Sequence, residues 1–158
     1  MKEFYKIILL AYIGEMVVNK INKEDEKYVK VREAMDFCWH WIENQKAELE
    51  RIYEFLDSEE EEDLVYYVIT AEEEKKEYEV ILGVVSYIAL NIITSNKEPV
   101  PQFLSETDEE YYNSIIADAI QLNIMDSDGK HINKIVKYCR DKEKENDFRF
   151  VKSQIMSL

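Results

Sequence analysis

Cysteine and histidine are the first side chains to test for chemistry, because together they are common zinc ligands. The chain has two of each, and Cys38 and His40 lie two residues apart on a predicted helix. Residues at this spacing point about 200° apart around a helix, so these two side chains cannot easily bind one metal ion. Cys38 falls on the apolar face of the helix and His40 on the opposite face. This pattern favours a buried structural thiol and a surface imidazole over a metal site.

A second motif resembles part of a calcium-binding loop. Asp126, Asp128 and Gly129 have the spacing of alternate ligands followed by the loop glycine. With Gly129 aligned to that glycine, Ile124 takes the first ligand position and Ile135 the twelfth, where acidic residues are needed. The motif therefore predicts a turn and a helix start. We expect this protein to use neither a metal nor another cofactor.

Nucleophilic catalysis requires a serine, cysteine or threonine beside a base. His40 and His131 are the only histidines, and neither lies in a known catalytic motif. The chain has no GxSxG, HExxH, P-loop or GxGxxG motif. Glutamates are so abundant that carboxylate pairs would arise by chance. These patterns give no support to an enzyme, and we expect the protein to act without catalysis.

Carboxylates are the most concentrated chemical groups in the chain. Residues 43–79 carry fifteen acidic side chains and four basic ones, so this segment has a net charge of −11 in a chain of net charge −14. A surface with this charge attracts and orients a basic protein partner. The same charge argues against nucleic acid and against an anionic membrane as ligands.

Tyrosine and tryptophan provide large contact areas at low entropy cost, and several of them adjoin the acidic runs. Trp39 lies about 100° from the centre of the apolar face of its predicted helix. Acidic side chains mixed with tyrosine suit a partner rich in lysine and arginine, although simple amphipathic packing of these aromatics at helix edges is the alternative. The candidate partner-binding residues are Glu59, Glu60, Glu61, Glu62, Asp63, Tyr66, Tyr67, Glu72, Glu73, Glu74, Glu77, Tyr78 and Trp39.

The elements that must position these residues are predicted to be helices. Three glycines and two prolines in 158 residues are too few for the turns of a strand-rich fold. We expect a single all-α domain over residues 1–158, built as a bundle of six to seven helices around a buried central helix at about residues 80–94. The predicted helices span residues 2–21, 23–44, 47–56, 59–69, 71–94, 108–123 and 130–143, followed by a helical tail.

Three acidic runs stand at predicted helix starts. Ser58, Thr70 and Thr107 each have a glutamate three residues later, which is the capping-box pattern. Carboxylates in a first turn also oppose the positive end of the helix dipole, so part of the acidic charge would serve the helices themselves. Another part is open to neutralisation within the molecule, because residues 130–158 carry a net charge of +4 and could pack on the acidic middle.

Cysteine usage and hydropathy bear on the location of the protein. Cys38 and Cys139 lie far apart and form no CxxC pair, which favours a reduced, cytoplasmic compartment. The apolar run at residues 80–93 is fourteen residues long and too short to span a bilayer. We therefore expect this run to form a buried helix and not a membrane segment.

The segment Arg32 to Glu43, REAMDFCWHWIE, carries a resemblance to a known family. Its Cys-Trp-x-Trp-x-Glu core resembles the second helix of the all-helical immunity-protein family six of bacterial polymorphic toxin systems. The likeness extends to the apolar helix with Tyr87 to Ala89, and to the Pro101 loop, which is followed by an acidic helix and an Asn123-Ile124 turn.

The resemblance implies a small cytoplasmic protein, encoded beside a toxin, that binds this cognate toxin and neutralises it. Such toxins are often nucleases, whose substrate-binding faces are cationic, which agrees with the acidic surface predicted here. An acidic helical adaptor that binds another basic protein, unrelated to toxins, is the alternative. The oligomeric state is not indicated by the sequence.

Overall fold

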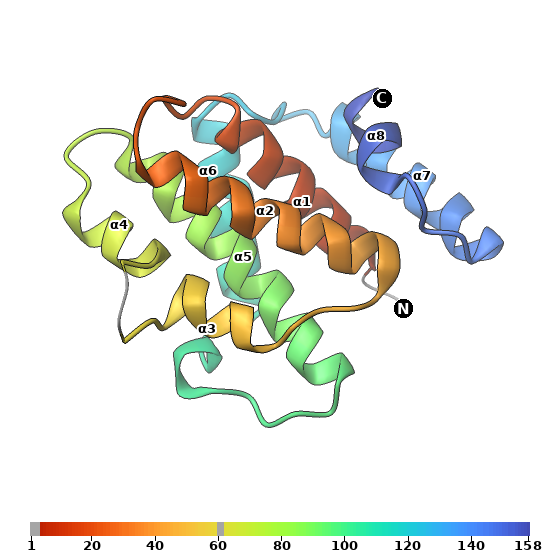
Figure 1. Cartoon of the computed structure of the whole chain (residues 1–158). Coiled ribbons are helices and arrows are strands. Elements are labelled where there is room, and N and C mark those ends of the chain that lie inside the picture. Colours follow the sequence, from red (N-terminus) through yellow and green to blue (C-terminus); the bar gives the residue numbers. More distant parts are fainter. Residues whose placement is uncertain (1–3, 60–61) are drawn as a thin grey trace.

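The computed structural model describes residues 4–59 and 62–158, and this part of the chain folds into helices with no strand (Figure 1). The predicted all-α class is confirmed. The described residues form eight α-helices where six to seven were predicted, and the eighth lies in the predicted helical tail. The helices are α1 (Phe4–Val18), α2 (Lys27–Asn44), α3 (Glu50–Leu56), α4 (Leu64–Thr70), α5 (Lys75–Ser95), the 3-10 helix η1 (Gln102–Leu104), α6 (Glu109–Gln121), α7 (Lys130–Glu145) and α8 (Val151–Met156).

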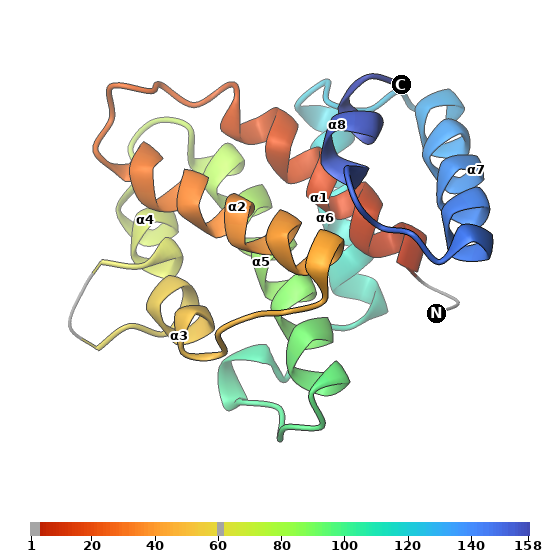
Figure 2. The same ribbon diagram turned by 45° about the vertical axis from the view of Figure 1, so that its right-hand side comes forward.

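Helix α5 is the central element of the bundle. It packs against α1, α2, α4 and α6, and both views show it crossing the middle of the molecule (Figures 1 and 2). By length and composition alone, this 21-residue helix could cross a membrane. However, 67% of its apolar 18-residue stretch is buried inside the protein. Such burial is typical of the core helix of a bundle, as predicted for residues 80–94.

Two glycines allow helices to approach closely around this core. A Cβ added at Gly83 would lie 2.8 Å from Ile115 Cγ1, where α6 crosses α5. A Cβ added at Gly14 would lie 2.6 Å from Met35 Sδ, where α2 crosses α1. A side chain at Gly83 would press on Ile115, whereas at Gly14 the flexible end of Met35 would have to shift.

Helix α1 is buried almost all round, including two charged residues. Lys6 is 7% exposed and its Nζ donates to Glu109 Oε2 of α6 at 2.7 Å. Glu15 is 5% exposed and pairs with Arg32 of α2 at 2.5 Å. Each buried charge thus has an ionic partner on a neighbouring helix, as buried charges require.

The basic C-terminal segment lies away from the acidic middle. Helix α7 packs on α1, and α8 packs on α1 and α2, at the opposite end of the molecule from α4 (Figures 1 and 2). This C-terminal segment forms a hydrogen bond with the acidic middle at Glu43, the first residue of that stretch. The Lys152 backbone N–H donates to Glu43 Oε2 at 3.2 Å. For the described residues of the acidic runs around α4, no ion pair with this segment is found.

The predicted capping boxes at Thr70 and Thr107 are wrong, and an aspartate caps each of α4 and α6. Asp63 caps α4 by accepting from Tyr66 N at 2.9 Å, and Asp108 caps α6 by accepting from Tyr111 N at 3.0 Å. Thr70 ends α4 instead of starting α5, since its hydroxyl donates to the Tyr66 carbonyl at 2.8 Å. Glu61, the predicted reciprocal partner of Ser58, lies outside the described residues.

The turn before α7 is as predicted. Gly129 has φ 76°, a backbone conformation that favours glycine, and Asp128 Oδ1 accepts from Lys130 N at 3.1 Å. Asp126 accepts the Gly129 N–H through its backbone carbonyl at 3.3 Å. The aspartates therefore form a turn that begins a helix.

Candidate partner-binding surface

Helix α4 is a short helix held between the two densest acidic segments of the chain. Asp63 fixes its start: one carboxylate oxygen caps the helix and the other accepts the Ser58 N–H at 2.9 Å, which closes the preceding loop. Asp63 is 9% exposed. Its carboxylate therefore stabilises the start of α4, and both of its oxygens are occupied within the protein.

The chain leaves α4 through a tight turn into α5. Ala71 is extended, and Glu74 has φ 58°, in the left-handed region, immediately before α5 begins at Lys75. Burial raises the pKa of the Glu74 carboxyl, and repulsion from Glu77 adds to this effect. Glu74 is therefore held partly against the protein at this turn, whereas Glu72 and Glu73 before it are exposed.

Tyr67 and Tyr78, which were predicted as partner-binding residues, are buried in this structure. They are 6% and 2% exposed, and their rings meet edge to face with centroids 6.1 Å apart. Lys27 of α2 lies over both rings, 5.9 Å and 5.4 Å from their centroids. This aromatic pair with its cation fastens α4 and α5 to the start of α2.

Trp39, another predicted partner-binding residue, is also buried. It is 2% exposed, and its indole Nε1 donates to Glu15 Oε1 at 2.9 Å. Its position off the apolar face of α2 does not expose it because α1 and α8 pack on that side of the helix. Trp39 therefore belongs to the core and to the ion pair of Glu15.

The outer face of α4 presents large apolar side chains that sequence reasoning mostly missed. Ile69 is 72% exposed, Tyr66 is 45% exposed and Val65 is 37% exposed. Only Tyr66 was among the predicted residues. The unbroken run of apolar and aromatic residues over 64–69 was the available signal, since a helix on the surface of a bundle cannot bury side chains all round its axis.

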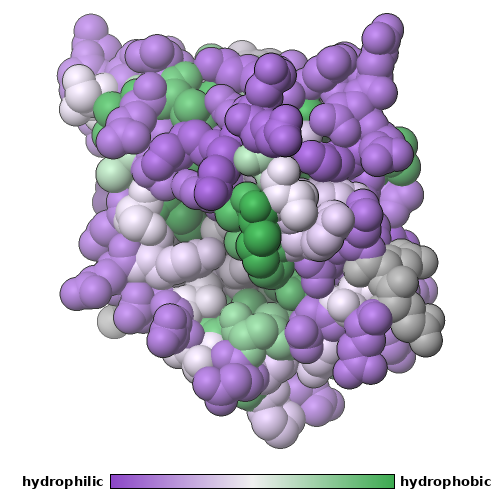
Figure 3. Space-filling view, turned by 90° about the vertical axis from the view of Figure 1, so that its left-hand side faces the viewer, coloured by the Kyte–Doolittle hydropathy of each residue, from purple (hydrophilic) through white to green (hydrophobic). Residues whose placement is uncertain are grey.

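The surface around these residues combines apolar and acidic groups. Figure 3 shows this side of the molecule, with hydrophobic side chains in its middle and hydrophilic ones around them. Among the predicted carboxylates, Glu59, Glu62, Glu72 and Glu73 are exposed, Glu74 and Glu77 are half-buried, and Glu60 and Glu61 lie outside the described residues. We call the exposed residues Val65, Tyr66 and Ile69 with Glu59, Glu62, Glu72 and Glu73 the α4 surface.

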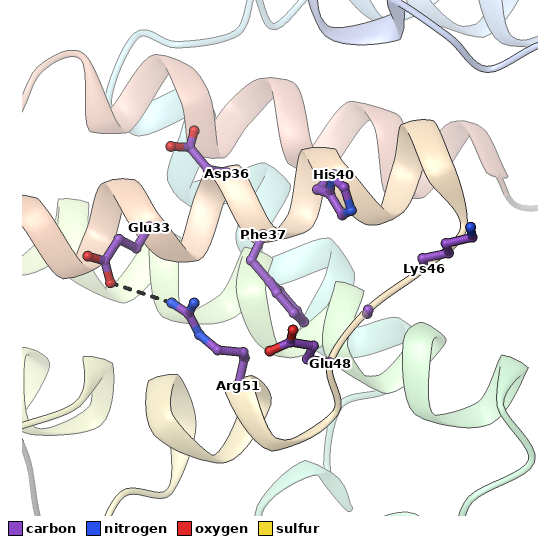
Figure 4. A pocket seen from close by; sticks show the side chains of 8 residues that line it. Glu33, Asp36, Phe37, His40, Lys46, Glu48 and Arg51 are labelled. Carbon is purple, nitrogen blue, oxygen red and sulfur yellow. Dashed lines mark hydrogen bonds and ion pairs between the residues drawn. The ribbon is translucent and has the colours of Figure 1, made fainter.

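A separate hollow of about 770 Å³ lies between α2 and the segment that leads into α3 (Figure 4). Phe37 and Ala47 supply its apolar wall, and the Arg51 guanidinium pairs with Glu33 at 3.5 Å across it. Lys46 also lines it. Acids and bases therefore already face one another in this hollow, which makes it less suited to a basic partner than the α4 surface.

The cysteines and His40 differ in their surroundings: both cysteines are buried and His40 is exposed. Within the described part of the chain, no group of three His, Cys, Asp or Glu side chains could hold a metal ion. Cys38 is a free, buried cysteine, and burial raises the pKa of its thiol to about 12. His40 is exposed beside Asn44, whose side-chain amide lies 3.2 Å from its Nδ1.

Comparison with known proteins identifies the family. The family model described as Immunity protein Imm6 matches residues 5–122, which is about three quarters of the chain and runs from α1 through α6. Neither a curated protein nor a solved structure matches the chain. The matched range contains the whole α4 surface and leaves out α7 and α8. This chain belongs to the Imm6 family of immunity proteins.

Proposed function

We propose that this immunity protein neutralises a cognate toxin by binding it stoichiometrically through the α4 surface. The observation that carries the proposal is the exposure of Ile69, Tyr66 and Val65 on one short helix between two acidic segments. Exposed apolar residues rimmed by charged ones are typical of protein–protein interfaces. Membership of an immunity-protein family supplies the kind of partner.

The partner we propose is a basic toxin domain, such as a nuclease. Segments 57–63 and 72–79 contain no arginine, and their only lysines are Lys75 and Lys76. Lys76 is paired with Asp118 at 3.3 Å and with Glu79 at 3.7 Å. A cationic toxin face would be drawn to this surface and oriented by it, and tyrosine and isoleucine would then be desolvated in the contact.

Inhibition would follow from occupation of the toxin and not from chemistry on it. A nuclease must present a cationic face to its substrate, so a bound acidic protein would exclude that substrate. We place this interaction in the cytoplasm, where the free thiols of Cys38 and Cys139 are stable.

The test is co-expression with the toxin encoded by the neighbouring gene. Growth should be restored by the wild-type immunity protein, and the purified pair should form a complex of fixed stoichiometry. Ile69→Glu should remove protection and weaken binding, because it places a charge in the apolar centre of the α4 surface. Leu158→Glu is the matched control, since Leu158 is 44% exposed at the other end of the molecule and its change should preserve protection.

Two results would count against the proposal. If the wild-type protein neither binds the toxin nor restores growth, the toxin assignment is wrong. If Ile69→Glu protects as well as Leu158→Glu does, binding occurs elsewhere on the protein.

A further inference from the structure

A groove adjoins the α4 surface on the side of α6. It is lined by residues from the end of α3, from α4, α5 and α6, and from η1 and the loop after it, and its volume is about 230 Å³. The volume is below the range of pockets for small molecules and cofactors, and it suits one large side chain. The lining residues are Leu56, Val65, Leu82, Ser86, Phe103, Glu106, Thr107 and Tyr111.

The hydroxyl groups of Ser86 and Tyr111, on the wall of this groove, are partnered with each other. Ser86 is 7% exposed and forms a side-chain hydrogen bond with Tyr111. The Thr107 N–H donates to the Leu104 carbonyl at 3.2 Å. An apolar side chain could therefore enter the groove without breaking the hydrogen bond between Ser86 and Tyr111. It would also gain contact with the apolar lining.

The residues that line the groove include no lysine or arginine, and the chain around them is mostly acidic. Residues 52–74, 77–96 and 98–129 contain no lysine or arginine, and Glu106 stands at the rim of the groove. Cations of neighbouring segments pair with some of these residues: Lys30 donates to the Glu62 carbonyl at 2.7 Å and Lys6 pairs with Glu109. Lys76 pairs with Asp118 and Arg51 pairs with Glu54. None of these four cations lines the groove. In contrast, the hollow of Figure 4 contains Lys46 and Arg51 in its own lining.

We infer that this groove receives one apolar side chain of the toxin, carried on a segment rich in lysine and arginine. The inference rests on the proposed function and names the anchor of the same interface, because Val65 belongs both to the groove and to the α4 surface. A side chain inserted into a pocket and ringed by weaker contacts is the usual form of a binding hot spot. The surrounding acids would pair with the basic residues on either side of that side chain.

The test fills the groove and measures toxin binding by calorimetry with the purified toxin domain of the neighbouring gene. Val65→Trp should weaken binding at least fivefold, because the indole would occupy the groove. Val136→Trp is the matched control, since Val136 is half-buried and lines a different hollow of about 380 Å³ on α7. Thermal melting verifies that both variants fold.

A second pair of variants covers the case in which Val65→Trp fails to fold. Glu106→Lys places a cation at the groove rim and should also weaken binding at least fivefold, whereas Glu143→Lys, at the α7 hollow, should not. If the wild type and Ile69→Glu behave as proposed but the folded groove variants bind within fivefold of wild type, the groove inference is wrong and the proposed function stands. If the wild type does not bind the toxin, both fail.

A benzophenone photocrosslinker at position 106 then tests the occupant. The crosslinked toxin peptide should contain an apolar residue with lysine or arginine close to it. A crosslink to an acidic segment would overturn the inference.

Discussion

Arg32 of α2 holds both carboxylate oxygens of Glu15 of α1, at 2.6 Å from Nη1 and 2.5 Å from Nη2. Trp39 Nε1 donates to the same carboxylate at 2.9 Å, and Lys152 of α8 lies 3.5 Å from it. Burial opposes ionisation of Glu15, but these hydrogen bonds and charges outweigh it and hold its pKa below the ordinary value. One buried carboxylate therefore joins α1, α2 and α8.

Arg32→Met should strongly destabilise the protein. The change leaves the buried Glu15 carboxylate without its bidentate partner, which typically costs about 3 kcal/mol of unfolding free energy. Urea unfolding at neutral pH measures the loss. Arg149→Met is the control, because Arg149 pairs with Asp147 on the exposed surface and its removal should change stability little. Equal stability of the two variants would show that Glu15 does not depend on Arg32.

Glu15→Gln should flatten the dependence of stability on acid pH. The pKa of Glu15 is lower in the folded protein than its usual value of 4.5, so the charged form is favoured by folding. This contribution is complete above the unfolded pKa and is lost as the pH falls through the folded pKa. Comparing urea unfolding at pH 7 and pH 3 should therefore show a smaller drop in the variant. A drop equal to that of wild type would contradict this assignment.

Charge reversal on the α4 surface should slow toxin association. The triple change Glu62→Lys, Glu72→Lys and Glu73→Lys should lower the on-rate about tenfold at low salt, because it removes electrostatic steering of a basic partner. The salt dependence of the on-rate should weaken as well, which stopped-flow measurements at several salt concentrations can follow. The control is Asp141→Lys, Glu143→Lys and Glu145→Lys on α7, which changes the net charge equally. If both triple variants slow association to the same extent, only the total charge matters.

Glu74→Gly should stabilise the protein. A residue other than glycine at φ 58° costs about 1 kcal/mol, and this change also removes a carboxylate whose pKa is raised by burial and by Glu77. Glu77→Gly is the opposite control, because it places glycine inside the first turn of α5 and should destabilise by about 1 kcal/mol. Thermal melting of the two variants should move in opposite directions, and a lower melting temperature for Glu74→Gly would contradict the expectation.

Helix content could be predicted because it depends on neighbouring residues in the chain. Local signals were enough for three features. Periodicity predicted the apolar second half of α5, and turn residues predicted the loop with the two prolines and the start of α7 at Lys130. The helix starts at α4 and α5 could not be placed as well. Several adjacent residues can cap a helix, and Asp63 prevailed over Ser58 because it also closes the preceding loop.

Exposure could not be predicted for the candidate site, because it depends on helices far away in sequence. Tyr66 and Tyr67 are neighbours beside the same acidic run, yet one is 45% exposed and the other 6%. Tyr67 is covered because α5 brings Tyr78 against it and α2 brings Lys27 over both rings.

The charge of the acidic middle, the helical class and the family likeness are properties that the order of residues carries directly. Periodicity and composition act over a few residues, so they survive without knowledge of the packing. Packing alone decided which side chains of that acidic middle face solvent. It buried Trp39, Tyr67 and Tyr78 against other helices and left Val65, Tyr66 and Ile69 outside, because α4 is too short to bury more than one face.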